Sequence, residues 1–148
     1  MRPGDAGVIF IWMRIAALDV GDARIGVAVS DELGISARGV GTVHRRGGRH
    51  DLDQLATILA PHEPERLVVG LPLNMDGTEG KQAARVRTFG ARAAAHLGIE
   101  VEYWDERLTT VEAEQALRDA AVPAKKRRAL VDRAAAAVIL RSYLDAHP

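Results

Sequence analysis

The chain contains no cysteine, and this absence excludes a disulfide framework, a cysteine-ligated metal site and a cysteine nucleophile. Aromatic residues make up only 4% of the sequence, so a hydrophobic core must be built mainly from Ala, Val, Leu and Ile. There is also no excess of charge, because 20 basic residues balance 20 acidic ones. The chain is therefore no polycation, and any binding of nucleic acid must rely on a local basic patch.

Long apolar runs are missing as well. The apolar run at residues 8–13 is much shorter than the roughly 20 residues that a membrane span needs, and no cleavage site of a secretory signal follows it. We therefore expect a cytoplasmic protein without a membrane segment. Residues 1–13 are interpreted as an extension outside a single domain at residues 14–148, and the alternatives are an extra strand or a translation start at Met13.

The hydrophobic pattern predicts alternating strands and helices. Short apolar runs that end in glycine or polar residues are typical of buried strands, whereas apolar residues at helical spacing predict helices. Strands are expected at residues 14–20, 25–30, 39–43, 66–70 and 99–104, a turn or mobile loop at 45–49, and helices from 51 to Pro61 and at 78–97, 109–120 and 130–144. This order predicts an α/β domain with a mixed central sheet and helices on both faces.

Three acidic residues lie where a folded chain would not ordinarily place a charge. Asp19 lies in an apolar run at the carboxyl end of the first strand, Glu106 follows the last strand, and Asp132 begins an otherwise apolar helix. A buried carboxylate needs a partner, a proton or a metal, and sites in open α/β sheets gather at the carboxyl ends of strands. If the three residues converge, their repulsion favours a divalent cation, and oxygen ligands alone favour Mg²⁺ or Mn²⁺.

Each carboxylate also has a simpler interpretation. Asp19 precedes a glycine turn and could be a turn former, while Asp132 could interact with a helix dipole. Glu106, between Asp105 and Arg107, could belong to a surface ion pair. Only the joint placement of the three residues indicates a site.

Four sequence blocks resemble those of a known family. They are LDVGDARIGVAVSD at residues 18–31, VGLPLNMDGT at 69–78, DERLTT at 105–110 and VDRAAA at 131–136. In this order and spacing they resemble the YqgF family, also called RuvX, a group of Holliday junction resolvases or pre-16S rRNA nucleases. The resemblance implies an RNase H-like fold and an acidic active-site set of Asp19, Glu106 and Asp132.

From this resemblance we expect a metal-dependent nuclease that hydrolyses phosphodiester bonds and processes the 5′ end of the 16S rRNA precursor in ribosome biogenesis. In a two-metal mechanism Asp19 would bridge cations about 4 Å apart, and Glu106 and Asp132 would complete the shell. The alternatives are a Holliday junction resolvase in DNA recombination or repair and a nucleic-acid-binding assembly factor without activity. The sequence leaves open whether the protein is a monomer or a homodimer.

Basic residues are candidates for contacts with substrate phosphates, although a merely solvated helix face is the alternative for some of them. One set recurs at helical spacing up to Arg92, a second precedes Asp132, and a third lies at residues 45–49. The family usually has Lys where this chain has Ala23, which weakens phosphate contact through that loop. The candidates are Arg24, Lys81, Arg85, Lys125, Lys126, Arg127 and Arg128.

The loop at residues 71–77 and its end contribute weaker candidates. Asn74, Asp76 and Thr78 either reach toward the active edge, which the resemblance favours, or only shape a turn between Pro72 and Gly77.

Overall fold

The computed structural model describes residues 13–31, 33–34, 36–109 and 124–147, and of residues 124–133 it describes the backbone alone. The described strands are β1 (Ile15–Val20), β2 (Arg24–Ser30), β3 (Ala37–His44), β4 (Arg66–Leu71) and β5 (Glu100–Asp105). The described helices are α1 (Gly48–Leu59), α2 (Lys81–Leu97) and α4 (Ala124–Ala146), with short 3₁₀ turns η2 (Ala60–His62) and η3 (Glu106–Leu108).

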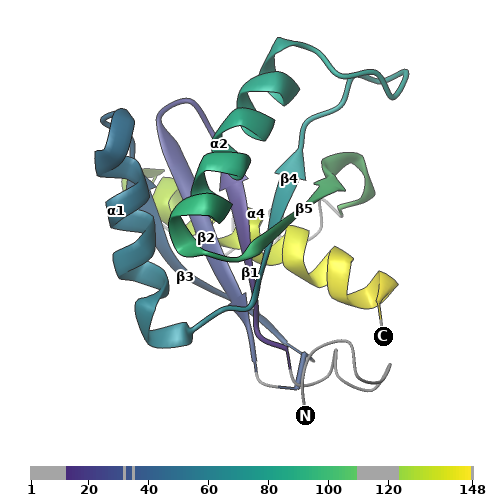
Figure 1. The fold of residues 1–148 in the computed structure, drawn as a ribbon. Helices are drawn as coiled ribbons and strands as arrows, with labels where there is room; N and C mark the ends of the chain where they lie inside the picture. Colours follow the sequence, from purple (N-terminus) through teal and green to yellow (C-terminus); the bar gives the residue numbers. More distant parts are fainter. Residues whose placement is uncertain (1–12, 32, 35, 110–123, 148) are drawn as a thin grey trace.

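The five strands form one mixed sheet in the order β3-β2-β1-β4-β5. The pairs β1–β2 and β2–β3 are antiparallel, whereas β4 runs parallel to both β1 and β5. The carboxyl ends of β1, β4 and β5 therefore meet at one edge of the sheet. Figure 1 shows α1 and α2 on one face of the sheet and α4 on the other. The predicted mixed sheet with helices on both faces is thus confirmed.

Side chains of β1 alternate between two hydrophobic cores, as successive residues of a strand must. Leu18 packs into the core under α1 and α2, together with Phe89. Ala17 packs into the core under α4, together with Ile139 and Leu140. Because both faces are covered, the strand reads as a nearly continuous apolar run, and Asp19 interrupts it on the α4 side.

Helix α1 begins at Gly48, three residues earlier than the apolar pattern predicts. The reason is Asp51, whose carboxylate is buried and accepts hydrogen bonds from the backbone N–H groups of Arg46 (2.8 Å) and Gly47 (3.2 and 3.3 Å). Burial by itself raises the pKa of Asp51, but these bonds and those from His50 and Arg45 lower it overall. The carboxylate therefore anchors the backbone just before the helix, in the segment that we expected to be a turn.

Helix α4 begins at Ala124, six residues before the predicted start at residue 130. The prediction relied on apolar periodicity, but Ala, Lys and Arg are strong helix formers and need no apolar partner to extend a helix. The basic run at residues 125–128 therefore lies in the first turns of α4. The helix expected at residues 109–120 lies almost entirely outside the described residues. No helix in the described part of the chain is long and apolar enough to cross a membrane.

Candidate active site

Two of the three predicted carboxylates come together at the edge where β1, β4 and β5 end. Asp19 lies on β1, paired with Gly26 of β2, and Glu106 opens η3 directly after β5. Only β4 separates β1 from β5. The side chains of Asp19 and Glu106 bridge this strand and are hydrogen-bonded to each other.

Gly70 of β4 makes this contact possible. A Cβ atom at Gly70 would lie 2.8 Å from Oε1 of Glu106 and 2.5 Å from Cδ1 of Ile139 on α4. Any side chain at this position would therefore occupy the space through which Glu106 crosses β4. Sequence reasoning treated Gly70 only as the end of a strand.

The electrostatics of the pair are those of two carboxyl groups that share a proton. Burial raises the pKa of Glu106 most, followed by the negative charge of Asp19 and the hydrogen bond to it, and the pKa reaches about 7 against an ordinary value of 4.5. A pKa this far from its ordinary value is typical of functional sites, because structural carboxylates are usually paired with a cation instead.

Arg107 is not the partner of Glu106, although the two are neighbours in sequence. Its Nη2 atom lies 2.7 Å from Oδ2 of Asp105, and its Nη1 atom donates a hydrogen bond of 3.3 Å to the carbonyl oxygen of Met75. Arg107 therefore ties η3 both to the end of β5 and to the loop that follows β4. The surface ion pair considered for Glu106 belongs to Asp105 in the structure.

Asp132 lies in α4, one turn before Ala136, which packs in the core on the Asp19 side of the sheet. The side chain of Asp132 is outside the described atoms, so its convergence with Asp19 and Glu106 stays a prediction. Among the side chains that the structure does describe, no group of three His, Asp or Glu residues could hold a metal ion.

The loop after β4 closes on itself. The Nδ2 atom of Asn74 donates to Oγ1 of Thr78 (2.9 Å), and Thr78 donates from Oγ1 (2.6 Å) and from its backbone N–H (3.0 Å) to Asp76. These bonds hold the pKa of Asp76 below its ordinary value. The three side chains thus shape the turn, and the loop reaches the active edge through the contact between Arg107 and Met75.

The predicted basic residues lie in two regions. Arg24 begins β2 and lies on the α4 side of the sheet, because its neighbour Ile25 packs into the core under α2. Lys81 and Arg85 are exposed on the first two turns of α2. Residues 125–128 lie on the opposite face of the sheet, in α4, with only their backbone described. Arg85 and Arg92 line one cavity together with Arg45, a grouping that linear spacing alone does not reveal.

Comparisons with known proteins show the family and the fold of the chain. A family model described as "RuvX: Holliday junction resolvase" matches residues 13–146. The chain is 51% identical over 134 residues to a protein of Syntrophus aciditrophicus, a match that covers 90% of this chain and 89% of that protein. It is 50% identical over 135 residues to a protein of Myxococcus xanthus, a match that covers 91% of this chain and 89% of that protein. Both relatives carry the name "Putative pre-16S rRNA nuclease".

Among solved structures, RuvC of Thermus thermophilus, described in complex with a Holliday junction substrate, has the same fold. The TM-score is 0.54 at 19% identity, and the match covers 90% of this chain and 96% of that one. The mixed sheet and the family match together define a nuclease with an RNase H-like fold, a hydrolase that acts on phosphodiester bonds. The chain belongs to the RuvX family of Holliday junction resolvases, also called YqgF.

Proposed function

We propose that this nuclease is metal-dependent and processes the 5′ end of the 16S rRNA precursor in the cytoplasm. The observation that carries the proposal is the hydrogen-bonded pair of Asp19 and Glu106 at the carboxyl ends of β1 and β5, with the pKa of Glu106 raised to about 7. The choice of precursor rRNA as substrate is supported by the names of relatives that are about half identical to the chain.

The carboxylate pair fits a divalent cation. The carboxylates of Asp19 and Glu106 lie within hydrogen-bond distance and repel each other once both are ionised. A cation relieves this repulsion as a proton does. Oxygen ligands without sulfur or nitrogen suit Mg²⁺ or Mn²⁺. We assign Asp19, Glu106 and Asp132 as the residues that would hold it, because α4 carries Asp132 on the face of the sheet where Asp19 lies. Bound there, the cation would stabilise the negative charge of the reaction and acidify water.

The protein's own residues prepare this site. The β1 backbone, paired on both sides, fixes Asp19, and Gly70 leaves the space in which Glu106 approaches it. Arg107 fixes η3 through Asp105, so Glu106 begins a turn that cannot swing freely. Glu106 holds a proton near neutral pH that it would have to lose to act as a ligand, and its burial limits the access of bulk water.

Substrate contacts are assigned to the basic residues near this edge. Lys81 and Arg85 would neutralise phosphates on the α2 side, and Arg24 and the run at residues 125–128 would do so on the α4 side. The loop with Asn74, Asp76 and Thr78 would border the scissile position. We place all of these contacts in one domain at residues 14–148, with residues 1–13 outside it. The family match to residues 13–146 supports such a domain but also includes Met13, which packs in the core under α4.

A Holliday junction resolvase is the second candidate, and the family description favours it. Resolvases cut two strands symmetrically, so this function requires a homodimer with two equivalent sites. Cleavage of the rRNA precursor, by contrast, needs only one site, so a monomer could carry it out as well as a homodimer.

The deciding experiment compares labelled 16S rRNA precursor and a labelled four-way DNA junction, with Mg²⁺, with Mn²⁺ and with chelator. Metal-dependent cutting near the mature 5′ end of the RNA is the expected result. Cutting of the junction alone, by a dimer, would replace the first proposal with the second. Tight binding of RNA without cutting under any metal condition would contradict both and indicate an assembly factor without activity.

Replacing Gly70 with alanine should lower both cleavage and stability. The added Cβ displaces Glu106 and Ile139, and overpacking of this kind costs about 1–3 kcal/mol of unfolding free energy. The double variant G70A/I139V removes the Cδ1 atom that causes one of the two clashes. We expect it to recover stability, measured by urea unfolding, but not cleavage. Recovery of full cleavage by the double variant would show that the position of Glu106 does not depend on Gly70.

A further inference from the structure

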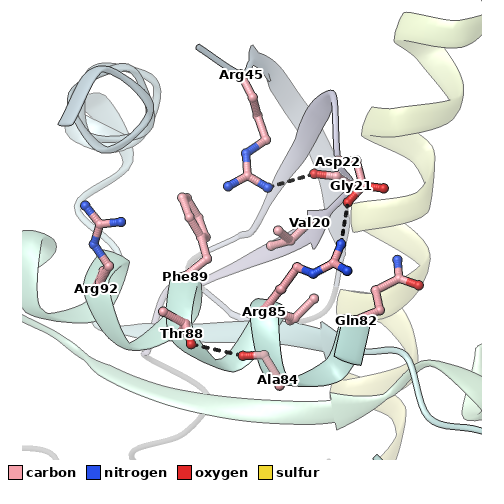
Figure 2. A pocket seen from close by; sticks show the side chains of 11 residues that line it. Val20, Gly21, Asp22, Arg45, Gln82, Ala84, Arg85, Thr88, Phe89 and Arg92 are labelled. Carbon is pink, nitrogen blue, oxygen red and sulfur yellow. Dashed lines mark hydrogen bonds and ion pairs between the residues drawn. The ribbon is translucent and has the colours of Figure 1, made fainter. Parts of the chain in front are cut away.

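A cavity of about 360 Å³ lies between the turn after β1 and the first half of α2. Three arginines from two parts of the chain line it, namely Arg45 after β3 and Arg85 and Arg92 on α2. Figure 2 shows the side chains of Phe89 and Arg92 rising from α2 and that of Arg85 reaching toward the turn at Gly21 and Asp22. The cavity is thus cationic on its walls and partly apolar on its floor.

This cavity is on the other side of the sheet from the carboxylate pair but at the same edge. Val20, which lines the cavity, packs into the core under α2 and directly follows Asp19 in β1. Because adjacent residues of a strand point to opposite faces, one end of β1 carries the carboxylate on one side and the cavity on the other. A polymeric ligand bound both at the carboxylate pair and in the cavity has to pass around the turn at Gly21.

Arg45 is held in place before any ligand binds. Its Nη1 atom donates a hydrogen bond of 2.9 Å to the carbonyl oxygen of Gly21, and its Nε atom lies 3.4 Å from the buried carboxylate of Asp51. The guanidinium group also lies over the ring of Phe89, 5.1 Å from its centroid. A cation fixed on three sides loses little conformational entropy when an anion binds.

Arg85 and Arg92 are available to an anion. Arg85 is paired with Asp22 at 3.8 Å, and both side chains are largely exposed, so the pair contributes little and can be exchanged. Arg92 is exposed and has neither a hydrogen bond nor an ion pair within the described part of the chain. The two arginines are seven residues apart on α2, which separates them by about 10 Å along the helix axis.

This spacing matches a polynucleotide strand. A single strand carries one backbone charge per nucleotide, so two cations about 10 Å apart can contact phosphates of the same strand that are a few nucleotides apart. We propose that the cavity binds backbone phosphates of the substrate strand, a few nucleotides away from the bond that is cut. This proposal rests on the proposed nuclease function and extends the phosphate contact assigned to Arg85, because it makes Arg45 the fixed anchor and adds Arg92 further along the strand.

The test measures binding, so that it does not depend on cleavage. Labelled single-stranded RNA is titrated with the wild type, R85E, R92E and R38E over a range of salt concentrations, with chelator present. Arg38 is the matched control, because it lines a separate cavity at the other end of the sheet. We expect R85E and R92E each to weaken binding about tenfold and to lower the salt slope by about 0.7 per lost phosphate contact, while R38E leaves both unchanged.

A second measurement identifies the ligand as a strand. Neutral methylphosphonate linkages are placed one at a time along the RNA, and one or two of them should weaken wild-type binding as R92E does and add no further loss in R92E. Competition by inorganic phosphate or a mononucleotide as effective as the RNA itself would overturn the proposal in favour of a small-anion site. Binding of RNA unaffected by R85E and R92E would overturn it too, and a bound acidic peptide would then become the alternative.

The two proposals fail in different ways. If the wild type cuts no nucleic acid but R85E and R92E lose RNA binding, the nuclease proposal fails, and the cavity keeps its role in binding a strand but not its place beside a bond that is cut. If the wild type cuts its substrate and both variants bind and cut equally well, the cavity proposal fails alone.

Discussion

The variant D19N should cut its substrate at least about a thousandfold more slowly than the wild type while it folds normally. An asparagine keeps the shape of Asp19 but removes one of the three carboxylates that we assign to the cation. Loss of residues that only orient metal ligands typically costs 10- to 100-fold, so loss of a ligand itself should cost more. Cleavage rates under single-turnover conditions, with Mg²⁺ and with Mn²⁺, measure the effect.

Stability separates this result from a folding defect. In the metal-free protein, Asp19 repels Glu106, so D19N should be as stable as the wild type or more stable. The matched control is D53N, which removes the same charge from the exposed surface of α1 and should cut normally. A D19N protein with wild-type cleavage would remove Asp19 from the active site, whatever its stability.

Local sequence pattern predicted the parts of the fold in which burial decides the structure. The apolar runs of β1, β2 and β4 are buried on both faces, and such runs permit few conformations other than central strands. The position of Asp19 at the end of one of these runs was visible for the same reason. A single charged residue is noticeable in a sequence only where the rest of its strand is apolar.

The helix boundaries that the apolar pattern did not predict depend on side-chain contacts with the backbone or on helix propensity alone. Helix α1 begins early because Asp51 accepts bonds from the chain before it, and α4 begins early because its basic residues are good helix formers. Neither feature alters the apolar periodicity, so neither could be found by it. A buried acid four residues into a helix is a signal that could have been used for α1.

The site itself was only partly predictable. The sequence blocks that resemble the family identified the carboxylates. The contact between Asp19 and Glu106, however, requires the parallel order β1-β4-β5 and a glycine in the strand between them. The cavity of Arg45, Arg85 and Arg92 was equally invisible, because Arg45 lies 40 residues before Arg85 in the sequence. Such groupings follow from topology, which spacing along the chain does not contain.

The second large effect concerns pH. In the metal-free protein, the pKa of Glu106 is about 7 in the folded state against an ordinary value of 4.5. The stabilisation that comes from protonated Glu106 is therefore fully present below pH 4.5 and is lost as the pH rises to about 7. In E106Q the amide replaces the protonated acid and does not ionise. We expect E106Q to be more stable than the wild type at pH 8 by about 2 kcal/mol, after allowance for the partial exposure of Glu106, with a smaller difference at pH 5.

Urea unfolding of both proteins in chelator, at several pH values between 5 and 8, measures this difference. The control is E79Q, because Glu79 is ion-paired with Arg87 at 2.6 Å and its pKa is lowered. The stabilisation from Glu79 is present above its ordinary pKa and is lost only as the pH falls through the lower folded value, so E79Q should gain no stability at pH 8. If E106Q and the wild type keep the same difference in stability from pH 5 to pH 8, then Glu106 does not carry a proton at neutral pH. In that case neither burial nor the charge of Asp19 perturbs Glu106 in the folded protein, so the repulsion that a cation at this edge of the sheet would relieve is absent.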